Sequence, residues 1–323
     1  MGDISISGVI GYIHLENLEN QILLLSDNHS SEQYCTVNSQ CISDWLLTKN
    51  SKILLEEVPR IEGSQLLALW ESKHIQQLKE IYLKQNFDEG QIEAIEAIDI
   101  RPLLIPFNLD IFTIDNIDKL KIDNMFKIKN IDKEYIEYIN IIDYLKILDS
   151  FFKLEHTYFI KNIGTVYKCI YTDNKEINKH FFELKNSFID LKKQYDNVSV
   201  LKNIDKEFKE FKNKIDELLS EIMEWYTIAK IFYNNKLGIH KFIIHAGLFH
   251  TTNLNKILID SYGYQKINSD GEINFKEIKD NNNNCLKIPS YVNSQFGGYD
   301  KKYRKYKGKY LALKKLNILV KSE

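Results

Sequence analysis

Residues 22–29 (ILLLSDNH) and residues 242–250 (FIIHAGLFH) share one form: an apolar run, followed by a tight polar turn that carries a histidine. A short apolar run closed by small or turn-forming residues is typical of a buried strand in a parallel sheet. In open parallel sheets, ligands bind just beyond the carboxyl ends of the strands. Both runs therefore direct histidines toward the edge of the sheet at which such folds bind ligands.

The rest of the chain has the composition of an ordinary globular protein. Its 323 residues are 44% hydrophobic and 27% charged, which is enough for one large domain or two smaller ones. With 43 basic and 45 acidic residues, the chain has no overall charge bias toward nucleic acid or a membrane surface. No run approaches transmembrane length, and no secretory signal is visible. We expect a cytoplasmic protein with neither a membrane nor a nucleic-acid partner.

The four cysteines, Cys35, Cys41, Cys169 and Cys285, form no CxxC pair. This spacing disfavours a thiolate zinc site. It also gives no indication of a disulfide framework, which fits a reducing compartment.

The pattern of apolar runs and amphipathic segments predicts an α/β fold: a mixed, mainly parallel sheet with flanking helices and a long helical hairpin insertion. Strands are expected at 5–13, 21–26, 52–58, 95–100, 242–245 and 286–289, with a hairpin turn at 18–20. Helices are expected at 41–47, 64–85 and 252–262.

The middle of the chain differs in character. Residues 116–160 are rich in Ile, Asp, Lys and Tyr, and we expect them to be helical. Two long helices are predicted at 177–195 and 203–232, because apolar residues there repeat at alternating spacings of four and three. The repeat in the second helix consists of Ile204, Phe208, Phe211, Ile215, Leu218 and Ile222. We interpret the hairpin as a helical layer packed on the sheet, with a coiled-coil dimer arm as the alternative.

The predicted domain organisation follows from these patterns. Residues 1–115 and 236–300 form the α/β core, residues 116–235 the helical insertion, and residues 301–323 a basic C-terminal helix rich in Tyr and Lys. The hairpin and the tail are the two segments expected to bind a protein partner.

Polar side chains follow three of the predicted strands. Asp27 and His29 form an Asp-x-His pair that presents both side chains on one side of an extended backbone. Glu56 and Glu57 end the next strand, where one carboxylate must point toward the buried side and needs a cation, a metal or a proton. The alternatives without function are a solvated turn for Asp27 and His29, and a surface pair of carboxylates for Glu56 and Glu57.

Asp99 and Arg101 end the third of these strands at a spacing that places both on one face. The guanidinium suits an anionic substrate or developing negative charge. The alternative is a structural ion pair, which is weakened because the chain has arginine at only three positions, Arg60, Arg101 and Arg304.

The second turn carries His245 and His250 on either side of Gly247, which permits a tight connection from strand to helix. Together with His29, Glu56 and Glu57, His250 forms a set suited to a divalent metal such as zinc, manganese or cobalt. Such a metal could activate water for hydrolysis. Without metal, a histidine would act as general base and Arg101 as electrophile.

These turns resemble those of the TIKI/TraB/erythromycin-esterase/ChaN-like superfamily, in which two Gly-x-x-His turns each follow a strand. Residues 247–250 (GLFH) match the second turn, whereas Ser26 replaces the glycine of the first. Glu56 or Glu57 would be the strand carboxylate and Arg101 the arginine. The resemblance covers residues 20–105 and 240–262. It implies a mixed α/β fold and an activity among metal-dependent peptidases, metal-independent esterases and haem-binding proteins.

The sequence therefore predicts a hydrolase that cleaves a peptide, ester or related bond in a peptide or a small molecule. The reaction would either use a bound metal or proceed without one. His29, Glu56 or Glu57, and His250 would bind metal or act as base, His245 would support them, and Asp99 would hold Arg101. Residues 302–311 (KYRKYKGKYL) resemble C-terminal segments of giant DNA virus proteins. This second resemblance implies a viral protein in the host cytoplasm or virion.

Two other functions compete with this prediction. One is a non-catalytic viral interaction or virion protein that keeps a degenerate TIKI-like site. The other is a calcineurin-like metallophosphoesterase, suggested by Asp27-x-His29 after an apolar strand. That family also needs a Gly-Asp motif and then a Gly-Asn-His motif between the first pair and the later histidines, and neither is present there.

Overall fold

The computed structural model describes residues 3–28, 35, 39–59, 65–67, 73–83, 94–101, 112–116, 119–122, 127–129, 138–153, 174–198, 204–278 and 285–297. The chain divides into two compact units. The first consists of Met1–Leu55, Ser72–Glu96 and Ile239–Glu323, and the second of Glu56–Glu71 and Ala97–Gly238. The boundaries of core, insertion and tail expected from the sequence stay a prediction. None of the described helices is both long and apolar enough to cross a membrane.

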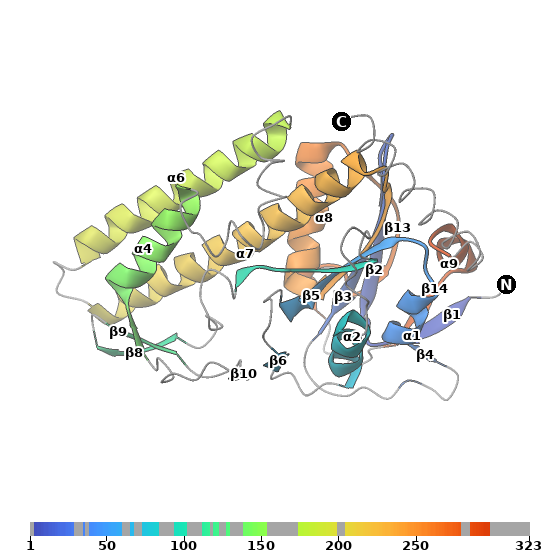
Figure 1. The fold of residues 1–323 in the computed structure, drawn as a ribbon, viewed down its shortest axis with the longest axis horizontal. Helices are drawn as coiled ribbons and strands as arrows, with labels where there is room; N and C mark the ends of the chain where they lie inside the picture. The colour runs from blue at the N-terminus through green and yellow to red at the C-terminus, as the bar shows by residue number, and fades with distance from the viewer. Residues whose placement is uncertain are drawn as a thin grey trace, which may run out of the picture. The chain divides into compact units, whose positions relative to one another are not determined.

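The main sheet has the strand order β13-β2-β3-β12-β5-β7. It is mixed and mostly parallel, which confirms the predicted fold class (Figure 1). Its strands are β2 (Gly11–Glu16), β3 (Gln21–Asp27), β5 (Lys52–Pro59), β7 (Ile95–Asp99), β12 (Lys241–Gly247) and β13 (Gln265–Gly271).

The two apolar runs singled out in the sequence are neighbouring parallel strands at the centre of this sheet. β3 and β12 pair in register from Gln21 opposite Lys241 to Asp27 opposite Gly247. Every residue after the first in each strand is buried. A strand covered on both faces needs a continuous apolar run, so the prediction of two buried parallel strands is confirmed.

The predicted strand at 5–13 is in fact two strands, β1 (Ile4–Ser7) and β2. Gly8 separates them with a φ of 88°, a conformation that glycine adopts readily and other residues do not. β1 lies in a small sheet between β14 (Cys285–Ile288) and β4 (Gln40–Cys41). The predicted hairpin between β2 and β3 is confirmed, and the Asn17 side chain caps its turn by accepting the N–H groups of Glu19 and Asn20.

Helices of the first unit are α1 (Ile42–Leu47), α2 (Lys73–Leu83), α8 (Leu248–Tyr262) and α9 (Ser290–Gln295), with the short 3-10 helix η2 (Phe275–Glu277). The predicted helix at 64–85 is wrong at residues 65–67, and α2 confirms it over Lys73–Leu83. Residues Gln65–Leu67 form strand β6, which pairs with β10 (Lys127–Lys129). Pairing with a distant strand has overridden the local periodicity there.

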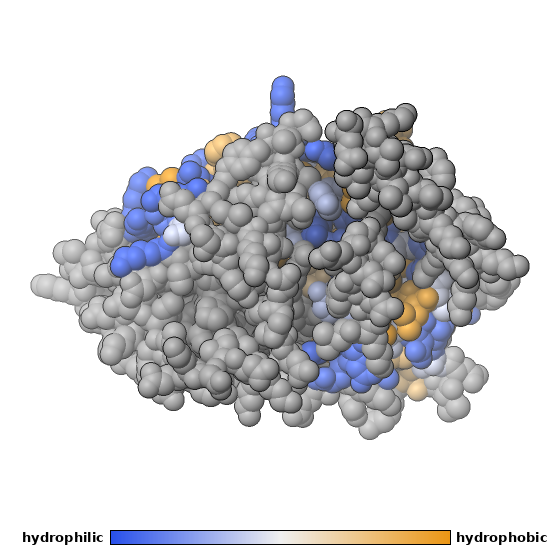
Figure 2. Space-filling view, viewed as in Figure 1, coloured by the Kyte–Doolittle hydropathy of each residue, from blue (hydrophilic) through white to orange (hydrophobic). Residues whose placement is uncertain are grey.

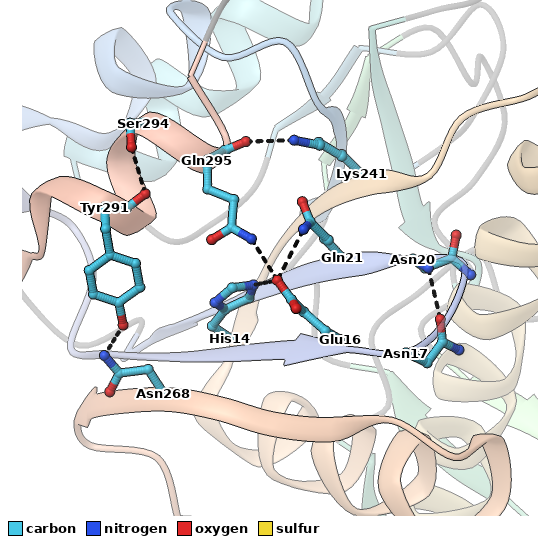
Figure 3. A network of polar contacts seen from close by, with 10 residues as sticks. All are labelled: His14, Glu16, Asn17, Asn20, Gln21, Lys241, Asn268, Tyr291, Ser294 and Gln295. Atoms are coloured by element: carbon cyan, nitrogen blue, oxygen red, sulfur yellow. Dashed lines mark hydrogen bonds and ion pairs between the residues drawn. The ribbon is translucent and has the colours of Figure 1, made fainter.

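A polar network fastens α9 to the β2–β3 hairpin at the end of the sheet where β3 and β12 begin (Figure 3). Glu16 Oε1 accepts hydrogen bonds from the side-chain amides of Gln21, at 3.0 Å, and Gln295, at 2.6 Å. Lys241 Nζ donates to the backbone carbonyl of Gln295 at 2.9 Å. The buried His14 places Nε2 3.1 Å from the same Glu16 oxygen. The polar residues at this end of the sheet therefore have a structural role, which is to hold α9 against the hairpin.

The second unit contains the predicted helical hairpin, formed by α6 (Lys175–Val198) and α7 (Ile204–Lys236), which pack along each other (Figure 1). Buried residues repeat along both helices at spacings of four and three, as a packed seam requires. They are Ile177, Phe181, Leu184, Phe188 and Leu191 on α6, and Phe211, Ile215, Leu218 and Ile222 on α7. The two helices thus bury their seam, and the packing of the hairpin on the sheet stays a prediction.

The expectation of helix throughout 116–160 is wrong. Among the described residues of that stretch, helix is confined to α4 (Ile141–Phe152). It is preceded by strands β8 (Phe112–Asn116), β9 (Lys119–Ile122) and β11 (Tyr138–Asn140), in the sheet order β11-β9-β8. Apolar residues alternate with polar ones in β8 and β9, and this period of two is the pattern of strands rather than helices.

The structure also pairs Cys35 with Cys285 in a disulfide, which the cysteine spacing did not indicate. The two cysteines are 250 residues apart in sequence, so their pairing depends on the fold and not on any local motif. Cys41 is a free cysteine, and Cys169 lies outside the described residues.

Candidate functional site

The two turns predicted to carry the chemistry lie next to each other, because β3 and β12 are neighbours. Asp27 ends β3 opposite Gly247, which ends β12 and precedes the first turn of α8. The hydroxyls of Ser26 and Thr251 are hydrogen-bonded at 2.8 Å, and both residues are buried. Ser26, the residue that departs from the glycine of the family pattern, therefore fastens the end of β3 to α8.

The strongest polar contact in this region joins Asp27 to His74. The two carboxylate oxygens of Asp27 lie 3.1 and 3.0 Å from Nε2 of His74, the second residue of α2. Asp27 is 1% exposed and His74 is 8% exposed. An ionised carboxylate accepts hydrogen bonds and cannot donate them, so Nε2 carries the proton of this contact and Nδ1 is the ring nitrogen left for a second partner.

Gly8 brings a third group to the same place. A Cβ on Gly8 would lie 2.9 Å from Cβ of His74, so only a glycine fits against this histidine. The Gly8 carbonyl accepts a hydrogen bond from Nε2 of His245 at 3.2 Å. His245 is fully buried in β12. One backbone residue thus contacts two histidines, and Gly8 positions both.

His250 lies in the first turn of α8 and is 6% exposed. Its ring meets the ring of Phe249 edge to face at a centroid distance of 5.3 Å. Asp27, His74, His245 and His250 all belong to the first unit. His29, the other histidine predicted for this site, lies outside the described residues.

The remaining predicted site residues form a separate group in the second unit. Arg101 donates from Nε to Oδ1 of Asp99 at 2.9 Å and from Nη2 to Oδ2 of Asp99 at 3.0 Å. The same Nη2 donates to Oε1 of Glu56 at 3.0 Å. Asp99 and Arg101 do lie together at the end of β7, and Glu56 of β5 joins them. The side chain of Glu57 lies outside the described residues.

Charge balance decides what the Arg101 group can do. Glu56 is 4% exposed and Asp99 is 7% exposed, and both contact one guanidinium. Two carboxylates and one arginine carry a net charge of −1, so Arg101 stabilises buried negative charge already present in the protein. Nε and Nη2 of Arg101 both donate to the carboxylate of Asp99, and this bidentate contact holds the guanidinium charge in a fixed orientation.

Metal binding was predicted for His29, Glu56, Glu57 and His250. In the part of the chain that the structure describes, no group of three or more His, Cys, Asp or Glu side chains is placed to hold a metal ion. Glu56 contacts Arg101 instead. His29 and the side chain of Glu57 lie outside the described residues, so the metal site stays a prediction, and we derive no chemical step through a metal.

Sequence reasoning missed His74 and Gly8. In the sequence, His74 falls on the apolar face of the helix expected at 64–85, where a histidine among leucines and isoleucines is typical of a buried structural residue. Its partner Asp27 was found, but as a partner of His29. Gly8 gave no signal, because its role depends on a contact with residues far away in sequence.

Comparison with known proteins does not identify the function of the site, which is therefore argued from its geometry. No protein-family model, curated protein or solved structure matches this chain.

Proposed function

We propose that this chain is a hydrolase that cleaves a peptide, ester or related bond, with His74 as general base and Asp27 as the carboxylate that orients it. The observation that supports this most is the buried contact between Asp27 and His74, beyond the end of a central parallel strand. A histidine held by a buried carboxylate is a recurrent device for moving protons in hydrolysis. Such folds bind ligands at this edge of the sheet.

The proposed reaction uses His74 to activate water. Nδ1 takes a proton from the water as its oxygen bonds to the carbonyl carbon of the substrate. The bond from that carbon to the leaving oxygen or nitrogen then breaks, and the same proton passes from Nδ1 to the leaving group. Throughout, the Asp27 carboxylate accepts a hydrogen bond from Nε2, which keeps its proton, and stabilises the charged ring that forms in between.

The role predicted for Arg101, stabilising an oxyanion or binding substrate, stays a separate prediction, because Arg101 belongs to the second unit and His74 to the first. Its support is the fixed orientation that Asp99 gives to the guanidinium. A double-mutant cycle between His74 and Arg101 tests whether the two residues serve one reaction. Non-additive losses in kcat/KM would show that they do.

The TIKI-like resemblance offers a version of this proposal that uses zinc, manganese or cobalt. Its ligands would be His29 and His250, with Glu56 or Glu57. Elemental mass spectrometry of the wild type, His29→Ala and His250→Ala separates the two versions. A stoichiometric metal that is lost in both variants would replace the mechanism based on His74 with one based on metal.

The test of the proposed function is hydrolysis of a panel of 4-nitrophenyl esters and peptide 4-nitroanilides by the wild type, His74→Gln and Asp27→Asn. We expect each variant to lower kcat by about 10²–10⁴-fold, which is the usual contribution of a general base. His240→Gln is the matched control, because His240 is an exposed histidine that precedes β12. Equal rates in the wild type and His74→Gln would contradict the proposal.

A second candidate, the non-catalytic interaction protein, is favoured by one observation on α6. Phe182 and Ile189 are 61% and 40% exposed and lie seven residues apart, hence on one face of the helix. Figure 2 shows a mainly hydrophilic surface along α6 with small apolar spots. Analytical ultracentrifugation of the wild type and of Phe182→Ser/Ile189→Ser tests whether this face joins two copies of the chain.

A further inference from the structure

The disulfide between Cys35 and Cys285 crosslinks two segments next to the proposed site. The Cα atoms of the two cysteines are 5.4 Å apart. Cys285 is the first residue of β14 and lies opposite Ser7, the last residue of β1. Cys35 follows Asp27 by eight residues in the sequence. The disulfide thus joins the segment that leaves β3 at Asp27 to the small sheet that contains β1.

Gly8, which directly follows the residue opposite Cys285, makes the contact with the site. A Cβ on Gly8 would lie 2.9 Å from Cβ of His74, and the Gly8 carbonyl accepts a hydrogen bond from His245 at 3.2 Å. Ser7 and Cys285 form the last pair of the β1–β14 ladder, and the end of such a ladder opens more readily than its middle. A crosslink at this pair therefore holds Gly8 in place, and Gly8 in turn holds the proposed general base.

The disulfide is accessible to small molecules. Cys35, Cys285 and Ser7 are each half-buried. A disulfide is reduced when a thiolate attacks one of its sulfur atoms, and exposed disulfides are more labile than buried structural ones. The exposure of both cysteines therefore permits a thiol in solution to open this crosslink.

A free thiol lies on the other side of Ser7. Cys41 ends β4 and is the parallel partner of Ser7, so Cys41 and Cys285 flank the same residue of β1. Two strand spacings place the Cα atoms of Cys41 and Cys285 about 10 Å apart, beyond the ~7 Å within which two cysteines can bond. The Cys41 thiol donates to Oε1 of Gln77 at 2.6 Å. Cys41 therefore cannot replace Cys35 as the partner of Cys285, which makes it a suitable control.

We propose that the disulfide between Cys35 and Cys285 is a redox site that holds His74 in its active position when oxidised and releases it when reduced; its effect on activity rests on the proposed hydrolase function. The reductant is a small thiol such as glutathione. Its thiolate bonds to one sulfur of the disulfide, and the other cysteine leaves as a thiolate and takes up a proton. A second thiolate then attacks the mixed disulfide, which frees the second cysteine and leaves the reductant as its own disulfide. Two electrons thus pass from two thiols to the protein, and oxidised glutathione reverses the reaction.

The ring N–H of His74 reports on the redox site without any turnover. Nε2 of His74 is in contact with Asp27, so its proton should give a side-chain signal in ¹H–¹⁵N NMR, assigned by its absence in His74→Gln. We expect this signal to shift or broaden when reduced glutathione opens the disulfide, and to return when oxidised glutathione closes it. Intact mass after alkylation of free thiols gives the redox state of the same samples. A disulfide that glutathione leaves closed in the folded protein, or a His74 signal that reduction does not change, overturns the inference.

Two cysteine variants separate the disulfide from thiols in general. Cys35→Ser should show the His74 signal of the reduced form in either glutathione buffer, because Cys41 lies too far from Cys285 to replace the lost partner. Cys41→Ser keeps the disulfide and should respond as the wild type does. A response that persists in Cys35→Ser, or disappears in Cys41→Ser, would assign the effect to another thiol and overturn the inference.

Hydrolysis of the preferred 4-nitrophenyl ester tests the consequence for activity. We expect reduction to lower kcat by about tenfold in the wild type and in Cys41→Ser, because a displaced general base loses its alignment with the substrate. Cys35→Ser should have the lower kcat in both buffers. A His74 signal that follows the redox state in a protein without hydrolysis would retain the redox site and remove the proposed function. Equal rates in both redox states would retain the function and overturn the inference.

A purely structural disulfide would stabilise the fold and leave His74 unchanged in the folded protein. The two cysteines are 250 residues apart, so their crosslink restricts the unfolded chain, and we expect Cys35→Ser to be less stable than the wild type. Circular dichroism and urea unfolding show whether the variant is folded under the conditions of the NMR experiment. If Cys35→Ser does not fold, the reversible reduction of the wild type and of Cys41→Ser carries both measurements, since neither needs a substitution in the disulfide.

Discussion

Gly8 and His74 are packed so closely that a Cβ on Gly8 would lie 2.9 Å from Cβ of His74. Gly8 also has a φ of 88° and accepts a hydrogen bond from His245. A single backbone residue thus fixes the place of the proposed general base from one side, while Asp27 fixes it from the other. This relationship lets stability and activity be tested at one position.

Gly8→Ala should destabilise the protein by about 2–4 kcal/mol, because it adds a backbone strain of about 1–2 kcal/mol to a steric clash. The matched control is Gly263→Ala. Gly263 has a φ of 69°, but a Cβ there would meet nothing within 4 Å, so only the strain remains. Urea unfolding measures both variants. Equal losses at the two positions would show that the close contact between Gly8 and His74 does not contribute.

Replacing Lys79 should stabilise the protein, in contrast to the destabilising Gly8→Ala. Lys79 is 8% exposed, and its buried amine has no hydrogen-bond partner among the residues that the structure describes. Burial lowers the pKa of this amine from its usual 10.5. Lys79→Met removes the cost of the buried polar group at similar volume and should stabilise the fold by about 1–2 kcal/mol.

The control for Lys79 is Lys256→Met, at an exposed position of α8. We expect no more than a few tenths of a kcal/mol there. The pH dependence gives a second check, because the unfolded chain holds the Lys79 proton more tightly than the folded one. Stability of the wild type should therefore rise as the pH rises from the lowered folded pKa toward 10.5, and this rise should shrink in Lys79→Met.

The fold could be predicted from the sequence where burial was local and continuous. The runs at 22–25 and 242–246 are covered on both faces, so their apolar composition alone identified them as parallel strands. The helices α6 and α7 could be predicted because apolar residues repeat along them at spacings of four and three. Prediction failed at 65–67, where pairing with β10 decides the structure, and at 119–122, where alternating apolar and polar residues form a strand instead of the expected helix.

The candidate site was predictable only in part, because half of it is made by contacts distant in sequence. Asp27, Asp99 and Arg101 could be found because each lies at the end of an apolar strand. His74 reaches Asp27 from α2, which is 47 residues away, and no spacing rule connects them. Glu56 was found as a carboxylate in need of a cation, and the cation proved to be Arg101.

His14 makes the fold sensitive to mild acid. Burial lowers the pKa of this imidazole from its usual 6.5, and the neighbouring Glu16 opposes that shift without cancelling it. The ring also packs edge to face against Phe296. Because the unfolded chain binds the proton more tightly, stability should fall as the pH drops from about 6.5 to the lowered folded value, by at most about 1.4 kcal/mol per pH unit.

His14→Leu should remove this part of the acid sensitivity. Thermal unfolding at pH 7.5, 6.5 and 5.5 would then show a smaller drop in Tm for His14→Leu than for the wild type. His240→Gln, which removes an exposed histidine, should keep the wild-type slope. A slope that is the same in all three proteins would mean that His14 is not the group responsible.

Arg101 is expected to matter for stability as well as for any reaction. Arg101→Met would leave Glu56 and Asp99 as two buried carboxylates without their shared cation, at a cost of about 2–3 kcal/mol. Arg101→Lys keeps the charge and loses the bidentate fork, so its cost should be smaller, about 1 kcal/mol.

Urea unfolding of the two Arg101 variants distinguishes the effect of the charge on stability from the effect of the bidentate geometry. Measuring kcat/KM on the best ester then shows whether Arg101 also contributes to catalysis. If Arg101 stabilises an oxyanion, Arg101→Lys should lose kcat by more than its small loss of stability explains, because a lysine held by Asp99 cannot present the same donors. If the group is only a structural ion pair, Arg101→Lys should keep its kcat while Arg101→Met loses folded protein. The lysine variant therefore decides between the functional and the structural interpretation of this arginine.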